Sequence, residues 1–316
     1  MKLNKIQNML LGIAIGDAFG MTYGLPEDRE SLKDRIDLSG FSPRMKKRVI
    51  RRPAGMYTDE TQMSIALVEL MLSDKEFNQE NLADFFVRCY KRDPLERAYS
   101  SSTENSLKTS DSGNDFLQNA DRNKISNGAA MRAVPLGILP NIDAVVQYAT
   151  INAQTSHNTP QGIASSIAVA LMSHYHFKYL SGISLFDYVE PHVRDICPEL
   201  TAHLKAVHEM QGEDPIILFG EENVKVGVPM DGIRAVGAVI YILSRFDNPL
   251  DVLKETVLLG GYTDCTAAIS LGANLIRHDV SELPPSFFRS LTNHPFGRDY
   301  ILSLGERLAQ KYPDSK

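Results

Sequence analysis

Two short acidic motifs stand ahead of apolar stretches in distant parts of the chain, Thr58-Asp59-Glu60-Thr61 and Thr263-Asp264-Cys265-Thr266. A hydroxyl and a carboxylate at such a point are ordinary helix-start chemistry, because the hydroxyl caps free amides and the carboxylate meets the positive end of the helix dipole. Glycines stand just before both motifs, at Gly55 and at Gly260-Gly261, where they let a ligand approach the backbone. Carboxylates at two helix starts also supply the hard oxygen ligands that Mg²⁺ prefers, and a carboxylate near the metal can take a proton from an attacking water.

A second group of polar residues surrounds a predicted helix start at Asn127-Gly128. Free amides and the positive dipole end of such a helix favour a bound phosphate. Arg132 lies in the first turn, where it either pairs with that phosphate or forms a buried structural ion pair. His157 either hydrogen-bonds a ligand or is a core histidine whose partners are all within the protein.

The elements that would carry these residues are almost all helices. Apolar residues recur at spacings of three and four in segment after segment, whereas alternating strand patterns are scarce. We therefore predict an all-α fold. Several segments rich in Ala, Gly and Ser, such as 162–171 and 267–274, should be inner helices, and the polar segment 93–124 should form a long loop or short helices at the surface. The predicted helices cover 5–20, 61–72, 81–91, 128–139, 142–152, 161–176, 185–194, 199–211, 232–244, 250–258 and 266–277.

Composition sets the broad class of the protein. The chain has 316 residues, 43% of them hydrophobic and 23% charged, which is typical of a globular protein, and no Pro/Ser/Gly-rich linker divides it. We expect a single domain over 1–316 in the cytoplasm. Three widely spaced cysteines cannot form a disulfide framework or a cysteine-based zinc site, and no apolar run is long enough to span a membrane.

The net charge of −6 argues against a chain-wide nucleic-acid surface, but one segment is strongly basic. Six of the nine residues from Arg44 to Arg52 are Lys or Arg. Charge runs of this kind usually form a solvated loop. The alternative hypothesis is that the segment guides an acidic target towards the neighbouring Thr58 motif.

Five stretches together resemble the ADP-ribosylglycohydrolase family, whose best-known bacterial members, the dinitrogenase reductase-activating glycohydrolases, remove ADP-ribose from dinitrogenase reductase. The N-terminal stretch is similar to the family's G-x-x-x-G-D-A-x-G helix, and Asn127-Gly-Ala-Ala-Met-Arg132 matches a family motif almost letter for letter. The two acidic motifs and the segment Thr155-Ser156-His157 correspond to the family's T-D-D-T, G-G-D-T-D and T-x-H motifs.

The resemblance implies a compact orthogonal multi-helix domain, a mostly monomeric protein and binding of ADP-ribose or an ADP-ribosylated protein. It places metal at Thr58, Asp59, Glu60 and Asp264, and the substrate at Asn127, Gly128, Ala129, Met131, Arg132, His157, Gly261 and Tyr262. Asp59 or Glu60 is the candidate catalytic base, and the diphosphate of ADP-ribose would lie at the helix start after Asn127.

Departures from the family pattern concentrate in the catalytic parts. Tyr262 replaces an aspartate with a phenol that is neutral near pH 7, Glu60 replaces the second aspartate of T-D-D-T, and Gly24 occupies a position where many members have a glutamate. Cys265 argues neither for nor against a metal at the site. Residues 99–103 take the place of a glycine-containing loop of the family. We therefore predict at most one Mg²⁺, and either a hydrolase of ADP-ribosyl bonds with a metal-depleted site or a module that binds ADP-ribose or another protein without turnover.

Overall fold

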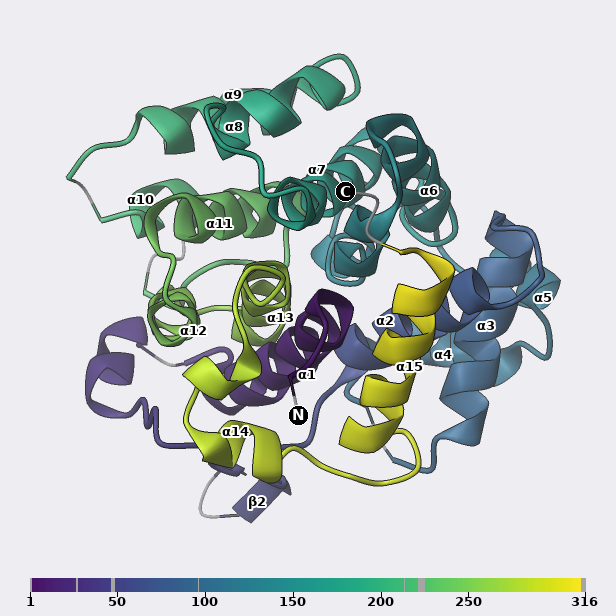
Figure 1. Ribbon diagram of the computed structural model, residues 1–316, viewed down its shortest axis with the longest axis horizontal. Helices are drawn as coiled ribbons and strands as arrows, with labels where there is room; N and C mark the ends of the chain where they lie inside the picture. The colour runs from purple at the N-terminus through teal and green to yellow at the C-terminus, as the bar shows by residue number, and fades with distance from the viewer. Residues whose placement is uncertain are drawn as a thin grey trace.

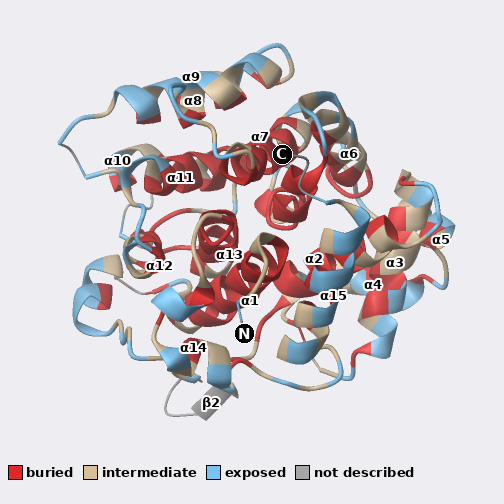
Figure 2. Ribbon diagram, in the orientation of Figure 1, coloured by how far each residue is buried: buried red, intermediate tan, exposed pale blue. Residues whose placement is uncertain are grey.

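The computed structural model describes residues 2–26, 28–46, 49–95, 97–212, 214–220 and 225–313, and within these it is a helical protein. Helices α1, α2, α7 and α13 are largely buried at the centre, while α5, α9 and α15 present exposed faces at the periphery (Figures 1 and 2). The all-α prediction is therefore confirmed, with one short antiparallel hairpin as an exception. The α-helices are α1 Lys5–Tyr23, α2 Asp59–Leu72, α3 Gln79–Arg92, α4 Ser101–Thr109, α5 Gly113–Asn119, α6 Ile142–Gln154, α7 Pro160–Phe177, α8 Leu185–Val189, α9 Pro198–Glu209, α10 Ile216–Phe219, α11 Gly232–Arg245, α12 Pro249–Leu258, α13 Thr263–Asn274, α14 Pro285–Arg289 and α15 Arg298–Lys311.

The tightest helix pair is α1 against α13, and a stripe of glycines makes it possible. Gly12, Gly16 and Gly20 recur every four residues on one face of α1, and a Cβ at any of them would collide with a carbonyl group of α13. At Gly16 that Cβ would lie 2.2 Å from the carbonyl oxygen of Ala267. The close approach places Asp17 of α1 near the first turn of α13, so packing of small residues assembles acidic groups that are far apart in the sequence.

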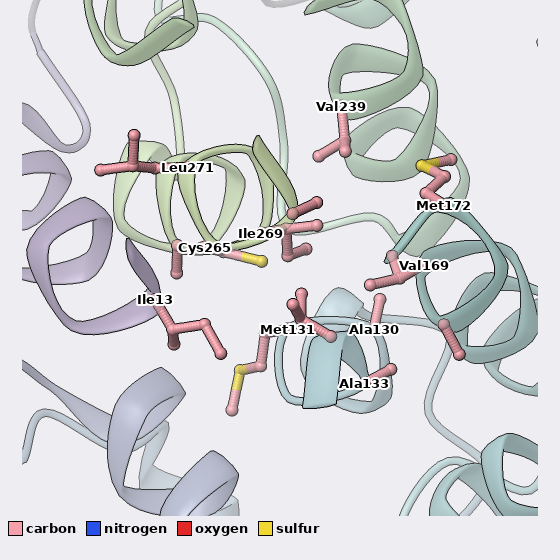
Figure 3. Packing of buried hydrophobic residues seen from close by; sticks show 14 of the residues in the cluster. Ile13, Ala130, Met131, Ala133, Val169, Met172, Val239, Cys265, Ile269 and Leu271 are labelled. Carbon is pink, nitrogen blue, oxygen red and sulfur yellow. The ribbon is translucent and has the colours of Figure 1, made fainter. Parts of the chain in front are cut away.

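Around this pair, apolar side chains from several helices form one core. Figure 3 shows residues of α1, α7, α11 and α13 meeting the segment that contains Ala130, Met131 and Ala133. The small-residue segments predicted as inner helices are both buried, within α7 and α13. This core forms the rigid support behind the acidic motifs.

One predicted helix is wrong. Residues 128–139 do not form an α-helix but two short 3₁₀ segments, Asn127–Ala129 and Val134–Ile138, the second with Pro135 at its start. Proline lacks an amide proton and disfavours helical conformation in the preceding residue, which explains why the apolar pattern did not continue as a helix. The phosphate site expected at the N-terminus of that helix therefore does not exist in the predicted form.

Other differences are smaller. Segment 93–124 carries the short helices α4 and α5, as predicted, whereas 185–194 divides into α8 and the 3₁₀ segment Glu190–His192 at a proline. The basic stretch forms a hairpin of β1 Arg44–Lys46 and β2 Val49–Arg52 instead of a loop; Lys47 and Arg48 lie outside the described residues. Helices α10, α14 and α15 were not predicted. None of the described helices is long and apolar enough to cross a membrane.

Candidate active site

The two acidic motifs open into one cavity of about 150 Å³. Its floor is formed by the first turns of α2 and α13, one wall by the segment 126–132 with Ser156 and His157, and the opposite wall by residues from 98 to 124. The structure brings these predicted site residues together along the cavity lining: Asp59, Glu60, Asn127, Gly128, Met131, Arg132, His157, Tyr262 and Asp264. Thr58, Ala129 and Gly261 are buried beside it and do not line it.

Asp17 holds the first acidic motif in place, and sequence reasoning did not assign it a role. Its carboxylate is fully buried and accepts hydrogen bonds from the Thr58 amide at 2.9 and 3.0 Å and from the Thr58 hydroxyl at 2.6 Å. It also accepts from the amide and hydroxyl of Thr61, at 3.1 and 2.6 Å. A carboxylate inside an otherwise apolar, glycine-rich helix was the signal available in the sequence. Asp17 is a positioning residue, because it fixes the turn that presents Asp59 and Glu60.

Asp59, Glu60 and Asp264 differ in their environments. Glu60 is buried and contacts the Thr58 hydroxyl, whereas Asp59 and Asp264 are only partly buried. Burial, followed by repulsion from Asp264 and Asp17, raises the pKa of Asp59 well above its usual value. Burial and then Asp59 raise the pKa of Glu60 in the same way, and burial raises the pKa of Asp264. The cavity floor thus carries an excess of negative charge in a partly desolvated environment.

The oxygen donors of the floor suit a single cation that keeps part of its water shell better than a cation enclosed entirely by protein ligands. Carboxylates and a hydroxyl are oxygen donors of the kind that Mg²⁺ takes, and a cation would relieve the repulsion that raises these pKa values. Among the residues that the structure describes, no three His, Cys, Asp or Glu side chains are grouped closely enough to enclose a metal by themselves. Mg²⁺ commonly keeps several waters in protein sites, so the chemistry of these donors does not conflict with a hydrated Mg²⁺.

The wall segment 126–132 carries an amide with free hydrogen-bonding capacity. Asn127 is 5% exposed, and its Nδ2 has no hydrogen-bond partner within the described part of the chain. Gly128 lies against His157 so closely that a Cβ would be 2.6 Å from the imidazole Cε1. Because a buried, unpartnered amide is costly, this corner is suited to a ligand that supplies an acceptor.

His157 and Arg132 are held by the protein on the cavity wall. The two ring nitrogens of His157 lie 2.9 Å from the hydroxyls of Ser126 and Ser156. Burial, and next the charge of Arg132, lowers the pKa of His157 well below its usual value, so this imidazole is neutral at pH 7. His157 therefore has satisfied partners within the protein, although it still faces the cavity.

Arg132 makes no buried ion pair with any residue that the structure describes, although such a pair was one of its two expected roles. Its guanidinium donates to the Asn152 side-chain oxygen at 2.7 Å and to the Ser156 hydroxyl at 2.6 Å, and it lies over the ring of Phe86. Burial lowers the pKa of Arg132 to about 9, which still leaves it charged at pH 7. It supplies a buried positive charge behind the wall that also carries His157.

The wall formed by residues 98–124 contributes Ser100 and Thr103, which belong to the segment 99–103 noted above, and Lys124, which sequence reasoning did not single out. Ala98 adopts φ of 60°, a left-handed conformation that is unusual for a residue with a Cβ. Tyr99 ties this wall to α2, because its hydroxyl donates to the Gln62 side-chain oxygen at 2.6 Å. The signal in the sequence was the correspondence of 99–103 to a family loop that closes over the ligand.

The departures at positions 262, 265 and 24 have different consequences. Tyr262 and Cys265 line the cavity, and burial together with Asp264 raises the pKa of Tyr262, which keeps it neutral. Gly24 does not line the cavity. A Cβ there would be 3.5 Å from the Thr263 hydroxyl, which is ordinary contact, so no steric constraint demands glycine. Among the residues that the structure describes, the acidic groups lining the cavity are the three that the motifs supply.

The whole chain, residues 1–316, matches the family profile described as ADP-ribosylglycohydrolase. The chain belongs to the ADP-ribosylglycohydrolase family. It is 24% identical to ADP-ribosylhydrolase ARH3 of Xenopus tropicalis over 98% of this chain and 96% of that protein. It is 27% identical to ADP-ribosylarginine hydrolase Tri1 of Pseudomonas putida (strain GB-1), over 98% of this chain and 79% of the relative. The resemblance inferred from the motifs is confirmed.

A solved structure supports the same fold. A chain from an "ADP-ribosylglycohydrolase-related protein complex" superposes with a TM-score of 0.74 at 19% identity, covering 97% of each chain. At that identity the likeness shows that this ADP-ribosylglycohydrolase family member has the family's fold.

Proposed function

We propose that this protein hydrolyses the glycosidic bond between ADP-ribose and a protein side chain or small molecule. The observation that carries the proposal is the convergence of Asp59, Glu60 and Asp264 on one cavity whose wall offers the unpartnered Asn127 amide. The polar groups of ADP-ribose complement this lining. Its ribose hydroxyls can bind a metal and the carboxylates of the floor, and its diphosphate can accept hydrogen bonds from the amide and the positively charged side chains. Relatives of this chain are named as hydrolases of ADP-ribosyl groups.

The cavity walls indicate how the ligand would be oriented. Lys124 and Arg132 supply positive charge and Asn127 supplies an amide donor to the two walls, between which the diphosphate is best accommodated. Among the described lining residues, the acidic floor is the only strongly anionic part, so the ribose next to the scissile bond belongs there. The expected helix N-terminus is replaced by these side chains in the role of phosphate partners.

A single Mg²⁺ held by some of Thr58, Asp59, Glu60 and Asp264 would grip the ribose hydroxyls and orient the attacking water. Asp59 is the preferred base for that water, since it is less buried than Glu60 and lines the cavity. Glu60 contacts the Thr58 hydroxyl and so shapes the floor. Asp17 keeps both carboxylates in position through Thr58 and Thr61.

Replacement of the two candidate bases tests the proposal. Asp59→Asn and Glu60→Gln should each abolish release of ADP-ribose from an ADP-ribosylated substrate, measured by chromatography of the product. Asp111→Asn is the matched control, because that carboxylate is 94% exposed and lies outside the cavity. Unchanged turnover in both floor variants would remove these residues from the mechanism.

A second candidate is a module that binds ADP-ribose without turnover. Tyr262 favours it, because a neutral phenol lines the floor beside Asp264 and leaves the acidic cluster with few anionic groups. The same assay separates the two. Tight binding of ADP-ribose by a wild type that releases none from arginine- or serine-linked substrates supports the binding module.

A further inference from the structure

A buried ion pair stands directly before the cavity wall formed by residues 98–124. The Arg97 Nε donates to the Asp93 carboxylate at 2.8 Å, and the two side chains are 1% and 2% exposed. Neither residue lines the cavity. Removing two charges from water is costly, so a buried pair commonly adds little stability compared with apolar side chains of the same volume. Stability alone therefore does not account for this pair.

Arg97 also contacts the turn that presents the first acidic motif. Its Nη1 donates to the Tyr57 carbonyl oxygen at 3.0 Å, one residue before Thr58, and its Cζ lies 3.9 Å from the centroid of the Tyr57 ring. A further contact joins Nη2 to Nε2 of His294, at 2.6 Å. Each guanidinium nitrogen thus has a partner, and the single nitrogen of a lysine could not hold these groups together.

A second contact to α2 lies two residues further along the chain. The Tyr99 hydroxyl donates to the Gln62 side-chain oxygen at 2.6 Å, and the Gln62 side-chain amide donates to Asp93 at 2.9 Å. We call this hydrogen-bonded set the Arg97 network; its members are Gln62, Asp93, Arg97 and Tyr99. Ala98, between two of them, lines the cavity with φ of 60°. This left-handed conformation is unfavourable for a residue with a Cβ, so the contacts on both sides of Ala98 impose it.

From Tyr99 a chain of contacts continues to the positive charge of the wall. The hydroxyl of the next residue, Ser100, donates to the Thr103 hydroxyl oxygen at 3.0 Å, and the Lys124 ammonium donates to the same oxygen at 3.2 Å. Ser100, Thr103 and Lys124 all line the cavity. The position of the Lys124 charge therefore depends on the wall, and the Arg97 network holds the start of that wall.

We propose that Arg97 and Tyr99 are positioning residues for ADP-ribose. They fix the start of the cavity wall relative to the first acidic motif, so that the ligand is held between the Lys124 charge and the Asp59 carboxylate. This inference rests on the proposed function and deepens it by naming the residues that set the wall. Neither of them lines the cavity, so each acts through the neighbouring Ala98, which does.

The cavity floor is held by different contacts, which allows an experiment to separate wall from floor. Asp17 of α1 accepts hydrogen bonds from the amide and the hydroxyl of Thr58, whereas the Arg97 network reaches α2 at Gln62. Loss of the network should therefore disturb the wall while Asp17 keeps the acidic turn in place. Affinity for ADP-ribose, which contacts both parts, should then fall, and affinity for Mg²⁺ alone should not.

The test uses Arg97→Lys, which keeps a positive charge beside Asp93, and Tyr99→Phe, which removes one hydroxyl and carries the test alone where Arg97→Lys does not fold. The matched control is Arg92→Lys. Arg92 also pairs with a carboxylate, that of Glu69, and lies over an aromatic ring, but it is 33% exposed and does not line the cavity. Calorimetry measures binding of ADP-ribose in Mg²⁺ and of Mg²⁺ alone, and hydrogen exchange measures the protection of amides 98–109.

We expect both variants to bind ADP-ribose about tenfold more weakly and to exchange amides 98–109 faster, with affinity for Mg²⁺ alone within about twofold of the wild type. Arg92→Lys should match the wild type in all three measurements. Unchanged affinity for ADP-ribose in a folded variant overturns the proposal. So does an equal loss in Arg92→Lys or a parallel loss of Mg²⁺ affinity, because the network would then act only on general stability. A wild type that binds no ADP-ribose contradicts the proposed function instead, and the exchange rates still show whether the network holds the wall.

Discussion

Asp17 is expected to be as important for activity as the residues that touch the ligand. In Asp17→Asn the side chain keeps its shape but retains one acceptor oxygen, and its new NH₂ group faces the donors of Thr58 or Thr61. At least two bonds to a buried carboxylate are lost, each worth about 1.5 kcal/mol or more. Relief of repulsion with Asp264 returns a part. We expect the free energy of unfolding to fall by about 2 to 3 kcal/mol.

Urea unfolding at pH 7.5, followed by circular dichroism, measures that change, and ADP-ribose release measures its consequence for the site. Turnover should fall at least tenfold at a temperature where the variant is folded, because Thr58 and Asp59 lose their fixed position. Thr61→Val and Thr61→Ser form a matched pair, since only the serine keeps a hydroxyl to donate to Asp17. An Asp17→Asn protein within about 0.5 kcal/mol of the wild type and fully active would refute the reasoning.

Three further predictions concern packing, pH and the floor of the cavity. Gly16→Ala should destabilise the protein by about 3 kcal/mol in urea unfolding, because its Cβ would lie 2.2 Å from a carbonyl oxygen of α13, whereas Gly24→Ala should match the wild type. Burial lowers the pKa of His176 to about 3 while the unfolded value is near 6.5, so the unfolded state takes up the proton first as pH falls, and about 2 kcal/mol of stability is lost between pH 7 and 5. His176→Leu should reduce that loss in unfolding curves at the two pH values; an unchanged loss contradicts the assignment. Tyr262→Asp should tighten Mg²⁺ binding in calorimetry relative to Tyr262→Phe, and equal affinities would show that position 262 does not face the ion.

The sequence predicted most of the site because chemically distinctive residues keep their local context in the fold. Thr58-Asp59-Glu60 and Asp264 start helices in the structure as their pattern indicated, with the carboxylates in the first turn. The expected capping by the hydroxyls is wrong, because the Thr58 hydroxyl donates to Asp17 and the Thr263 hydroxyl donates to the Gly20 carbonyl oxygen. The Asn127 segment was placed at the site but in the wrong conformation. An apolar pattern cannot distinguish a helix from consecutive 3₁₀ turns, and the local effect of Pro135 was underestimated.

The rest depended on contacts between distant segments. Nothing near Asp17 in sequence shows that it binds the turn at Thr58, 41 residues away. The wall from Ala98 to Lys124 reaches the cavity through tertiary bonds such as that of Tyr99 to Gln62, which no local pattern encodes. Helix α15 was missed because its amphipathic face follows a run of turns and prolines, and its burial against α1 stabilises it more than its intrinsic propensity does.

The most direct test of the account is calorimetric titration of the protein with ADP-ribose, once in Mg²⁺ and once in EDTA, together with the Mg²⁺ stoichiometry. We predict that ADP-ribose binds in both buffers, binds more tightly in Mg²⁺, and that one ion binds per chain. Absence of binding in both buffers would show that the cavity does not accept ADP-ribose, and affinity that is indifferent to Mg²⁺, or two ions per chain, would contradict the single-ion floor.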